Sequence, residues 1–127
     1  MPAKILIVDD SVTALLMEEM LLKKYTKFDV VQARDGREAV QTAIAEQPNL
    51  ILMDVVMPRM DGFAACREMR RQPKLRETPI ILVTSRGEPQ NVEQGFESGC
   101  NDYITKPVES QELIQMVNGY LAEEKSR

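Results

Sequence analysis

The sequence predicts an α/β fold in which helices cover both faces of a parallel sheet. Short apolar runs alternate along the 127 residues with longer segments whose apolar residues have helical spacing. Nearly continuous short apolar runs are typical of strands buried on both faces. Their regular alternation with helices predicts five βα units joined by right-handed crossovers, in a doubly wound arrangement. The length suits one domain, so residues 1–127 are expected to form a single domain.

Five segments are predicted as strands. Three are almost uninterrupted apolar runs: Lys4–Val8, Leu50–Met53 and Pro79–Val83. Two weaker candidates, Phe28–Gln32 and Asp102–Thr105, contain more polar residues, which suits strands at the edges of a sheet.

The segments between the strands predict helices. Asp35 with Glu38 three residues later forms a capping-box pattern at the start of the second helix. Lys23 and Lys24 stand in the last turn of the first helix, where the helix dipole favours cations. The expected core-facing sets are Val12, Leu15, Leu16 and Met20; Ala39, Val40, Ala43 and Ile44; and Leu113, Ile114, Val117 and Leu121.

Composition excludes several classes of protein. The chain is 43% hydrophobic and 28% charged, which is typical of a globular domain. The longest uncharged stretch, Leu113–Ala122, is too short for a membrane helix of about 20 residues. No basic segment followed by an apolar run opens the chain, so no secretory signal is visible. We therefore expect a soluble, cytoplasmic protein without a membrane partner.

Residue types and spacings that the chain lacks exclude several kinds of catalytic and metal site. The chain has no histidine, which removes the commonest general base and metal ligand. Cys66 and Cys100 show no CxxC spacing, so neither a zinc site nor a redox pair is indicated, and Cys66 is expected to be a small core residue. The net charge of −4 argues against direct binding of nucleic acid.

Reactive side chains follow four of the predicted strands. Asp9 and Asp10 end the first, Asp54 the third, Thr84 and Ser85 the fourth, and Lys106 and Pro107 the fifth. Taken singly, an aspartate here could be a helix cap or a turn residue, and Lys106 a solvated charge. Because ligands of open α/β sheets bind beyond the carboxyl ends of the strands, we expect these residues to share one site.

Three converging carboxylates repel one another, and at least one would be driven toward protonation unless a cation joined them. With no histidine and no nearby cysteine, all available ligands are oxygens, which selects a hard divalent cation, most plausibly Mg²⁺. Lys106 and the Thr84 hydroxyl could contact the oxygens of a phosphoryl group. The best-placed nucleophile is Asp54, which would form an aspartyl phosphate.

These residues resemble those of the response-regulator receiver domains (CheY-like) of two-component signalling. The resemblance covers about residues 3–122 and follows the family's order and spacing. It implies a flavodoxin-like (βα)5 sheet with strand order 2-1-3-4-5. No output domain is expected, since only a short charged tail follows the last predicted helix, which runs to about residue 122. The motifs that carry the resemblance are Ile7 to Ser11, Met53 to Pro58 with Asp61 and Gly62, Val83 to Ser85, and Tyr103 to Pro107.

The resemblance also implies roles for the residues of the site. Asp54 would accept the phosphoryl group, and Lys106, with a cis bond to Pro107, would contact it, with Ser85 as a small neighbour. Mg²⁺ would be held by Asp10, Asp54 and the main-chain carbonyl of Val56, with Asp9 acting through a water molecule. Thr84 would move toward the phosphoryl group, and Tyr103, otherwise an aromatic residue packed on the last helix, would turn inward.

The implied partners are proteins. The phosphodonor would be a sensor histidine kinase or a phosphotransfer protein, and a downstream protein would bind the surface of the fourth helix, fifth strand and fifth helix. The chain would be a monomer or a phosphorylation-dependent dimer. It would not be an enzyme beyond its own phosphorylation and dephosphorylation. Dephosphorylation would be slow, because neither Val56 nor Arg86 offers a carboxylate or amide that orients an attacking water.

Two alternatives conflict with the residues present, and two others stay open. A dehalogenase-like phosphatase would need a second acid where Val56 stands, and a flavin-binding domain would need a Gly/Ser/Thr-rich loop where the acidic segment from Asp9 to Val12 stands. The chain could also be a receiver-fold binding module that acts without phosphorylation. Finally, it could be the receiver fragment of a longer transcriptional or enzymatic response regulator.

Overall fold

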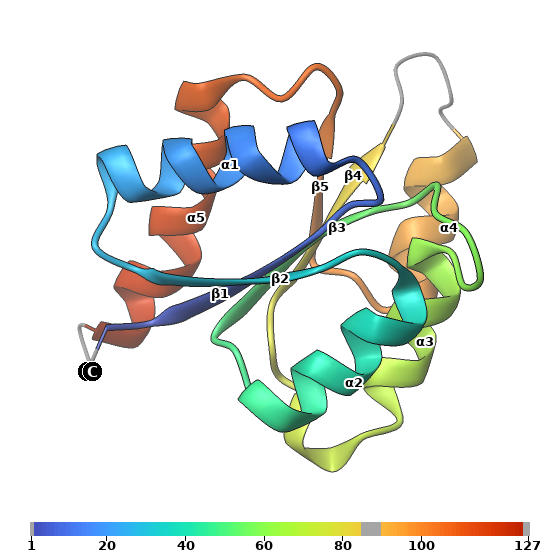
Figure 1. The fold of residues 1–127 in the computed structure, drawn as a ribbon. Coiled ribbons are helices and arrows are strands. Elements are labelled where there is room, and N and C mark those ends of the chain that lie inside the picture. Colours follow the sequence, from blue (N-terminus) through green and yellow to red (C-terminus); the bar gives the residue numbers. More distant parts are fainter. Residues whose placement is uncertain (1, 85–89, 126–127) are drawn as a thin grey trace.

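The structure is a computed structural model that describes the backbone of residues 2–84 and 90–125 and the side chains of residues 2–84 and 93–121. Strands and helices alternate along these residues, as the sequence predicts (Figure 1). The strands are β1 (Lys4–Val8), β2 (Asp29–Ala33), β3 (Leu50–Asp54), β4 (Ile80–Thr84) and β5 (Asp102–Thr105). The helices are α1 (Val12–Tyr25), α2 (Gly36–Glu46), α3 (Gly62–Arg70), α4 (Gln90–Ser98) and α5 (Ser110–Lys125), with a short 3-10 turn at Pro73–Leu75.

The five strands form one parallel sheet in the order β2-β1-β3-β4-β5, which confirms the predicted flavodoxin-like topology. Helices α1 and α5 cover one face of the sheet, and α2, α3 and α4 cover the other (Figure 1). Side chains of successive strand residues alternate between the two faces. In β1, Ile5 and Ile7 pack in the core beneath α1 and α5, whereas Leu6 and Val8 pack in the core on the opposite face.

Five strand boundaries differ from the predicted ones by one residue: both ends of β2, both ends of β4 and the end of β3. β2 begins at Asp29 and ends at Ala33, so Phe28 precedes it. β3 and β4 each extend one residue further, to Asp54 and Thr84. Both residues are paired in the sheet, Asp54 with Val83 and Thr84 with Thr105. The sheet therefore fixes the backbone of two candidate site residues directly.

The predicted core face of α1 is wrong. Val12, Leu16 and Met20 are more than half exposed, at 58%, 57% and 63%, while the buried residues of the helix include Glu18 and Leu22. A hydrophobic pattern includes only apolar residues, and the buried face contains Glu18. The pattern therefore predicted a neighbouring face of the same helix as the core face. Leu15 is the predicted member that does face the core. In α2, Ile44 is likewise exposed, at the border of an otherwise buried predicted face.

The capping box of α2 is present with one change. The Asp35 carboxylate accepts a hydrogen bond from the Glu38 amide at 2.8 Å, as predicted. The Glu38 carboxylate bonds the amide of Arg34, one residue earlier than the usual reciprocal partner. Asp35 also pairs with Arg59 at 2.9 Å, which connects the start of α2 to the loop after β3.

Candidate functional site

The three predicted carboxylates converge at the carboxyl ends of β1 and β3. β1 pairs with β3 in parallel, with Val8 opposite Met53, so the residues that follow these two positions are neighbours. Asp9 and Asp54 are buried, at 1% and 5% exposure, and Asp10 is exposed. One carboxylate oxygen from each residue lies within 4.8 Å of the others. We call Asp9, Asp10 and Asp54 the acid cluster.

Lys106 brings one positive charge to the acid cluster. Its ammonium donates a hydrogen bond to Asp54 Oδ2 at 2.9 Å and lies 3.7 Å from Asp9 Oδ2. Its main-chain amide donates to the Thr84 carbonyl at 2.7 Å, which ties the end of β5 to the end of β4. The bond from Lys106 to Pro107 is cis, as the family resemblance implied.

The loop after β3 lies against the backbone of Asp54. A Cβ atom on Gly62 would stand 2.5 Å from the Asp54 carbonyl oxygen, so only glycine allows this approach. The Gly62 amide donates to the Val55 carbonyl at 2.8 Å, and Asp61 caps α3 through the Ala64 amide. In this loop between β3 and α3, the side chain of Val56 is exposed, with a fractional exposure of 65%.

Burial, hydrogen bonds and neighbouring charges shift the pKa values of Asp9 and Lys106. Burial raises the pKa of Asp9, the hydrogen bond from the Ser11 amide lowers it, and the charge of Asp54 raises it again, with a net increase. Burial lowers the pKa of Lys106, but the hydrogen bond to Asp54 and the nearby carboxylates outweigh it and raise the pKa overall. One ammonium thus faces three carboxylates, and this all-oxygen donor set fits a hard divalent cation.

Thr84 and Tyr103 occupy different surroundings. Thr84, the last residue of β4, is 3% exposed. Tyr103 is 37% exposed, and its ring meets Phe96 of α4 edge-on, with centroids 6.0 Å apart. The expectation that Tyr103 packs on the last helix is wrong, because Ile104 occupies that face of β5 and the adjacent residue points to the α4 face. Ser85 and Arg86 lie outside the described residues.

One ionisable group near the site could not be predicted from the sequence. Glu18 lies on the buried face of α1 with 6% exposure. Burial raises the pKa of its carboxyl to about 8, and the charges of Asp9 and Asp54 add to the increase. A buried glutamate in a helix gives no signal in a hydrophobic pattern, and only its contact environment reveals it.

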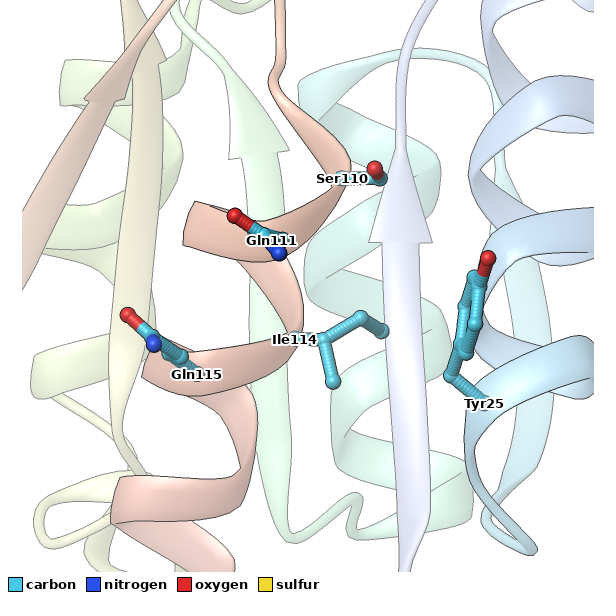
Figure 2. A pocket seen from close by; sticks show the side chains of 5 residues that line it. All are labelled: Tyr25, Ser110, Gln111, Ile114 and Gln115. Atoms are coloured by element: carbon cyan, nitrogen blue, oxygen red, sulfur yellow. The ribbon is translucent and has the colours of Figure 1, made fainter.

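A separate hollow of about 310 Å³ lies between the end of α1 and the start of α5. Figure 2 shows that Ile114 and Tyr25 enter it from the two helices, and that the side chains of Gln111 and Gln115 line it on α5. None of its lining residues is a carboxylate or an ammonium. This hollow therefore lacks the charged groups that phosphoryl or metal chemistry requires.

Comparison with known proteins identifies the family. The model of the response regulator receiver domain matches residues 5–118. The chain belongs to this family.

No helix among the described residues is both long enough and apolar enough to cross a membrane.

The similar curated proteins differ in length. Protein PilH of Pseudomonas aeruginosa is 37% identical over 120 residues, which cover 94% of this chain and 98% of PilH. The transcriptional regulator RpaA of Synechocystis is 36% identical over 120 residues, which cover 93% of this chain but only 48% of RpaA. The receiver therefore spans almost the whole of one relative and about half of the other.

Solved structures of similar chains share the fold. A putative response regulator from Chloroflexus aurantiacus superposes with a TM-score of 0.91 at 37% identity, covering 96% of this chain and 99% of that chain. The receiver domain of the sensor histidine kinase PA1611 from Pseudomonas aeruginosa superposes with a TM-score of 0.88 at 31% identity, covering 96% and 99%. The latter structure holds a magnesium ion coordinated in its active-site cleft.

Proposed function

We propose that this receiver is a phosphorylation switch in which Asp54 accepts a phosphoryl group from the phosphohistidine of a sensor kinase or phosphotransfer protein. The observation that carries this proposal is the acid cluster with Lys106 hydrogen-bonded to Asp54 at 2.9 Å. A buried carboxylate at the end of a central strand, facing an ammonium, is suited to attack phosphorus. Membership of the receiver family supports the same role.

Asp10, Asp54 and the Val56 main-chain carbonyl would hold Mg²⁺, with Asp9 acting through a water molecule. The all-oxygen set within 4.8 Å supports this assignment. When bound, the ion neutralises charge on the phosphoryl oxygens and on the carboxylates. The magnesium-bound receiver of PA1611 supports the choice of metal.

The chain's own groups then perform the transfer. An oxygen of the Asp54 carboxylate forms the new bond to phosphorus while the bond from phosphorus to the histidine nitrogen breaks, and the imidazole keeps that electron pair and takes up a proton. Lys106 stabilises the developing negative charge by contacting a phosphoryl oxygen. The Thr84 hydroxyl donates to another oxygen, with Pro107 as a neighbour. This chemistry acts on the protein itself, so we infer that the chain is a switch and not an enzyme.

The response would be read at the surface of α4, β5 and α5. Movement of Thr84 toward the phosphoryl group would leave space for Tyr103, which now rests on Phe96 of α4. A change in this aromatic contact would alter α4 and β5 together, and a downstream protein would bind one of the two states. The chain matches almost the whole of PilH and about half of RpaA, so its relatives include both a chain of receiver length and a longer regulator.

Intact-protein mass spectrometry tests the switch. We expect incubation with acetyl phosphate to add one phosphoryl group only when Mg²⁺ is present, and Asp54→Asn to abolish the gain. A parallel sample with beryllofluoride and Mg²⁺, observed by NMR, requires no transfer step. If neither reagent modifies the wild-type chain, the acid cluster is not a phosphorylation site and the non-phosphorylated binding module becomes the better description.

A further inference from the structure

A hollow of about 500 Å³ lies beside the acid cluster, between α1 and the segment that follows β5. Figure 1 shows that segment passing close to α1 on its way to α5. Met17 and Leu21 form the wall on α1, and Pro107 and Val108 form the opposite wall. A volume of this size is within the range of sites that bind small organic molecules.

One of the residues that line this hollow has a polar atom without a hydrogen-bond partner. Glu18 lines the hollow and is 6% exposed, and its Oε1 atom is fully buried without a hydrogen bond. It is the one buried side-chain oxygen or nitrogen in this state among the described residues. Buried polar groups are almost always hydrogen-bonded, because an unsatisfied group costs free energy. Glu18 therefore lines an apolar space and has an unused acceptor, which a ligand donor reaches when the Glu18 side chain turns toward the hollow.

The cationic side chain that lines the hollow already contacts the acid cluster. Lys106 also lines the hollow, but its ammonium bonds Asp54 at 2.9 Å and lies 3.7 Å from Asp9. The charged groups that act on Glu18 are Lys106 and the two carboxylates Asp9 and Asp54. The balance of these charges is negative, so a positive group that enters the hollow gains from all three carboxyl groups.

We propose that this hollow is a binding site for a small organic cation, with its ammonium on Glu18 and its apolar body against Met17, Leu21 and Val108. A protonated amine supplies N–H donors for the unpartnered oxygen and stabilises the ionised carboxyl. The apolar part of the ligand covers the Met17 side chain, which is 60% exposed, and so removes it from water. Because Lys106 lines this hollow and also contacts the acid cluster, the occupant lies next to the proposed phosphorylation site.

NMR titration of the whole chain with benzylamine tests this site at pH 8, without Mg²⁺ or a phosphodonor. The result is thus independent of the chemistry of Asp54. We expect saturable shifts of the amides around Met17, Leu21 and Val108. Benzyl alcohol, which has nearly the same shape but no charge, should bind at least about tenfold more weakly, since a charge-assisted hydrogen bond is lost.

Variants identify the group responsible. Glu18→Gln should weaken benzylamine binding by at least about tenfold. Glu19→Gln is the matched control, because this adjacent carboxylate bonds the Gln32 side chain at 2.7 Å and does not line the hollow, and it should leave binding unchanged. Val108→Phe, which fills the hollow from its other wall, should also abolish binding. Unchanged shifts on the α2–α3 face show that each variant is folded.

Three results overturn the proposal. The first is equal binding of benzylamine and benzyl alcohol, which would make the hollow a merely apolar groove. The second is unchanged benzylamine binding in Glu18→Gln. The third is the absence of saturable shifts around the hollow in the wild-type chain.

Discussion

The Lys106 ammonium donates a hydrogen bond to Asp54 across 52 residues of sequence, at 2.9 Å. The same ammonium lies 3.7 Å from Asp9, so one cation compensates two buried carboxylates. Because both carboxylates are buried, their Coulomb attraction to the ammonium is screened less than in a fully exposed ion pair. This contact connects β1, β3 and the end of β5 at the point where the proposed chemistry takes place.

Lys106→Met should slow phosphorylation of Asp54 by acetyl phosphate by about 100-fold, because a preorganised cation contributes about that much to stabilising transferred charge. The rate is measured as the gain in intact mass at saturating Mg²⁺. Lys4→Met is the matched control, since Lys4 forms an ion pair with Glu46 at 2.7 Å on the surface. Equal rates for both variants would show that Lys106 has no part in the transfer.

Gly62→Ala should destabilise the chain by about 3 kcal/mol, since its Cβ atom would stand 2.5 Å from the Asp54 carbonyl oxygen and the backbone must shift. Gly119→Ala in α5 is the matched control, because nothing lies within 4 Å of its Cβ position. That substitution should stabilise the helix by about 0.5–1 kcal/mol. Urea unfolding measures both values, and a neutral effect at Gly62 would contradict the close approach.

Much of the fold could be predicted because continuous apolar strands and local capping signals are short-range features. The start of α2 at Asp35 and the strand β1 follow directly from such patterns. The strand order came from the family resemblance, because periodicity alone does not determine which strands are neighbours. The site could be predicted for a physical reason as well: parallel strands bring their last residues to one edge, so Asp54 and Lys106 meet despite their separation.

Other features could not be predicted because they depend on which side of an element packs inward. The pattern in α1 allowed two adjacent stripes, and the buried one contains Glu18. The ring contact of Tyr103 with Phe96 depends on which face of β5 meets α4. The contact of Asp35 with Arg59, which connects α2 to the loop after β3, is a long-range pair without a local signal.

The two thiols should be unreactive in the folded chain. Cys66 and Cys100 are both buried, and burial raises the pKa of Cys100 to about 11, with Cys66 shifted in the same direction. A thiol that stays protonated is a poor nucleophile. At pH 8, both cysteines should react with a thiol reagent at least about 100-fold faster in 8 M urea than in buffer. Rapid labelling of either residue in buffer would contradict their assignment as core residues.

Glu18 should make folding stability depend on pH. Its pKa is about 8 in the folded chain and 4.5 as the reference value of the unfolded chain. The folded state therefore binds the proton more tightly, so this contribution to stability is complete below pH 4.5 and is lost as the pH rises to about 8. Each pKa unit corresponds to about 1.4 kcal/mol. Between pH 5 and pH 9 the wild-type chain should lose about 4 kcal/mol through this group.

Comparison with Glu18→Gln isolates that loss, because the other titrating groups are shared by both chains. Urea unfolding without Mg²⁺ at several pH values gives the free energy of unfolding of each chain. The difference should change steadily in favour of Glu18→Gln as the pH rises from 5 and level off above about 8, where the Glu18 carboxyl is ionised in both states. Glu77→Gln, which removes an exposed carboxylate, should show no such trend. Parallel stability curves for wild type and Glu18→Gln would mean that the Glu18 carboxyl reaches water or a partner when the protein is folded.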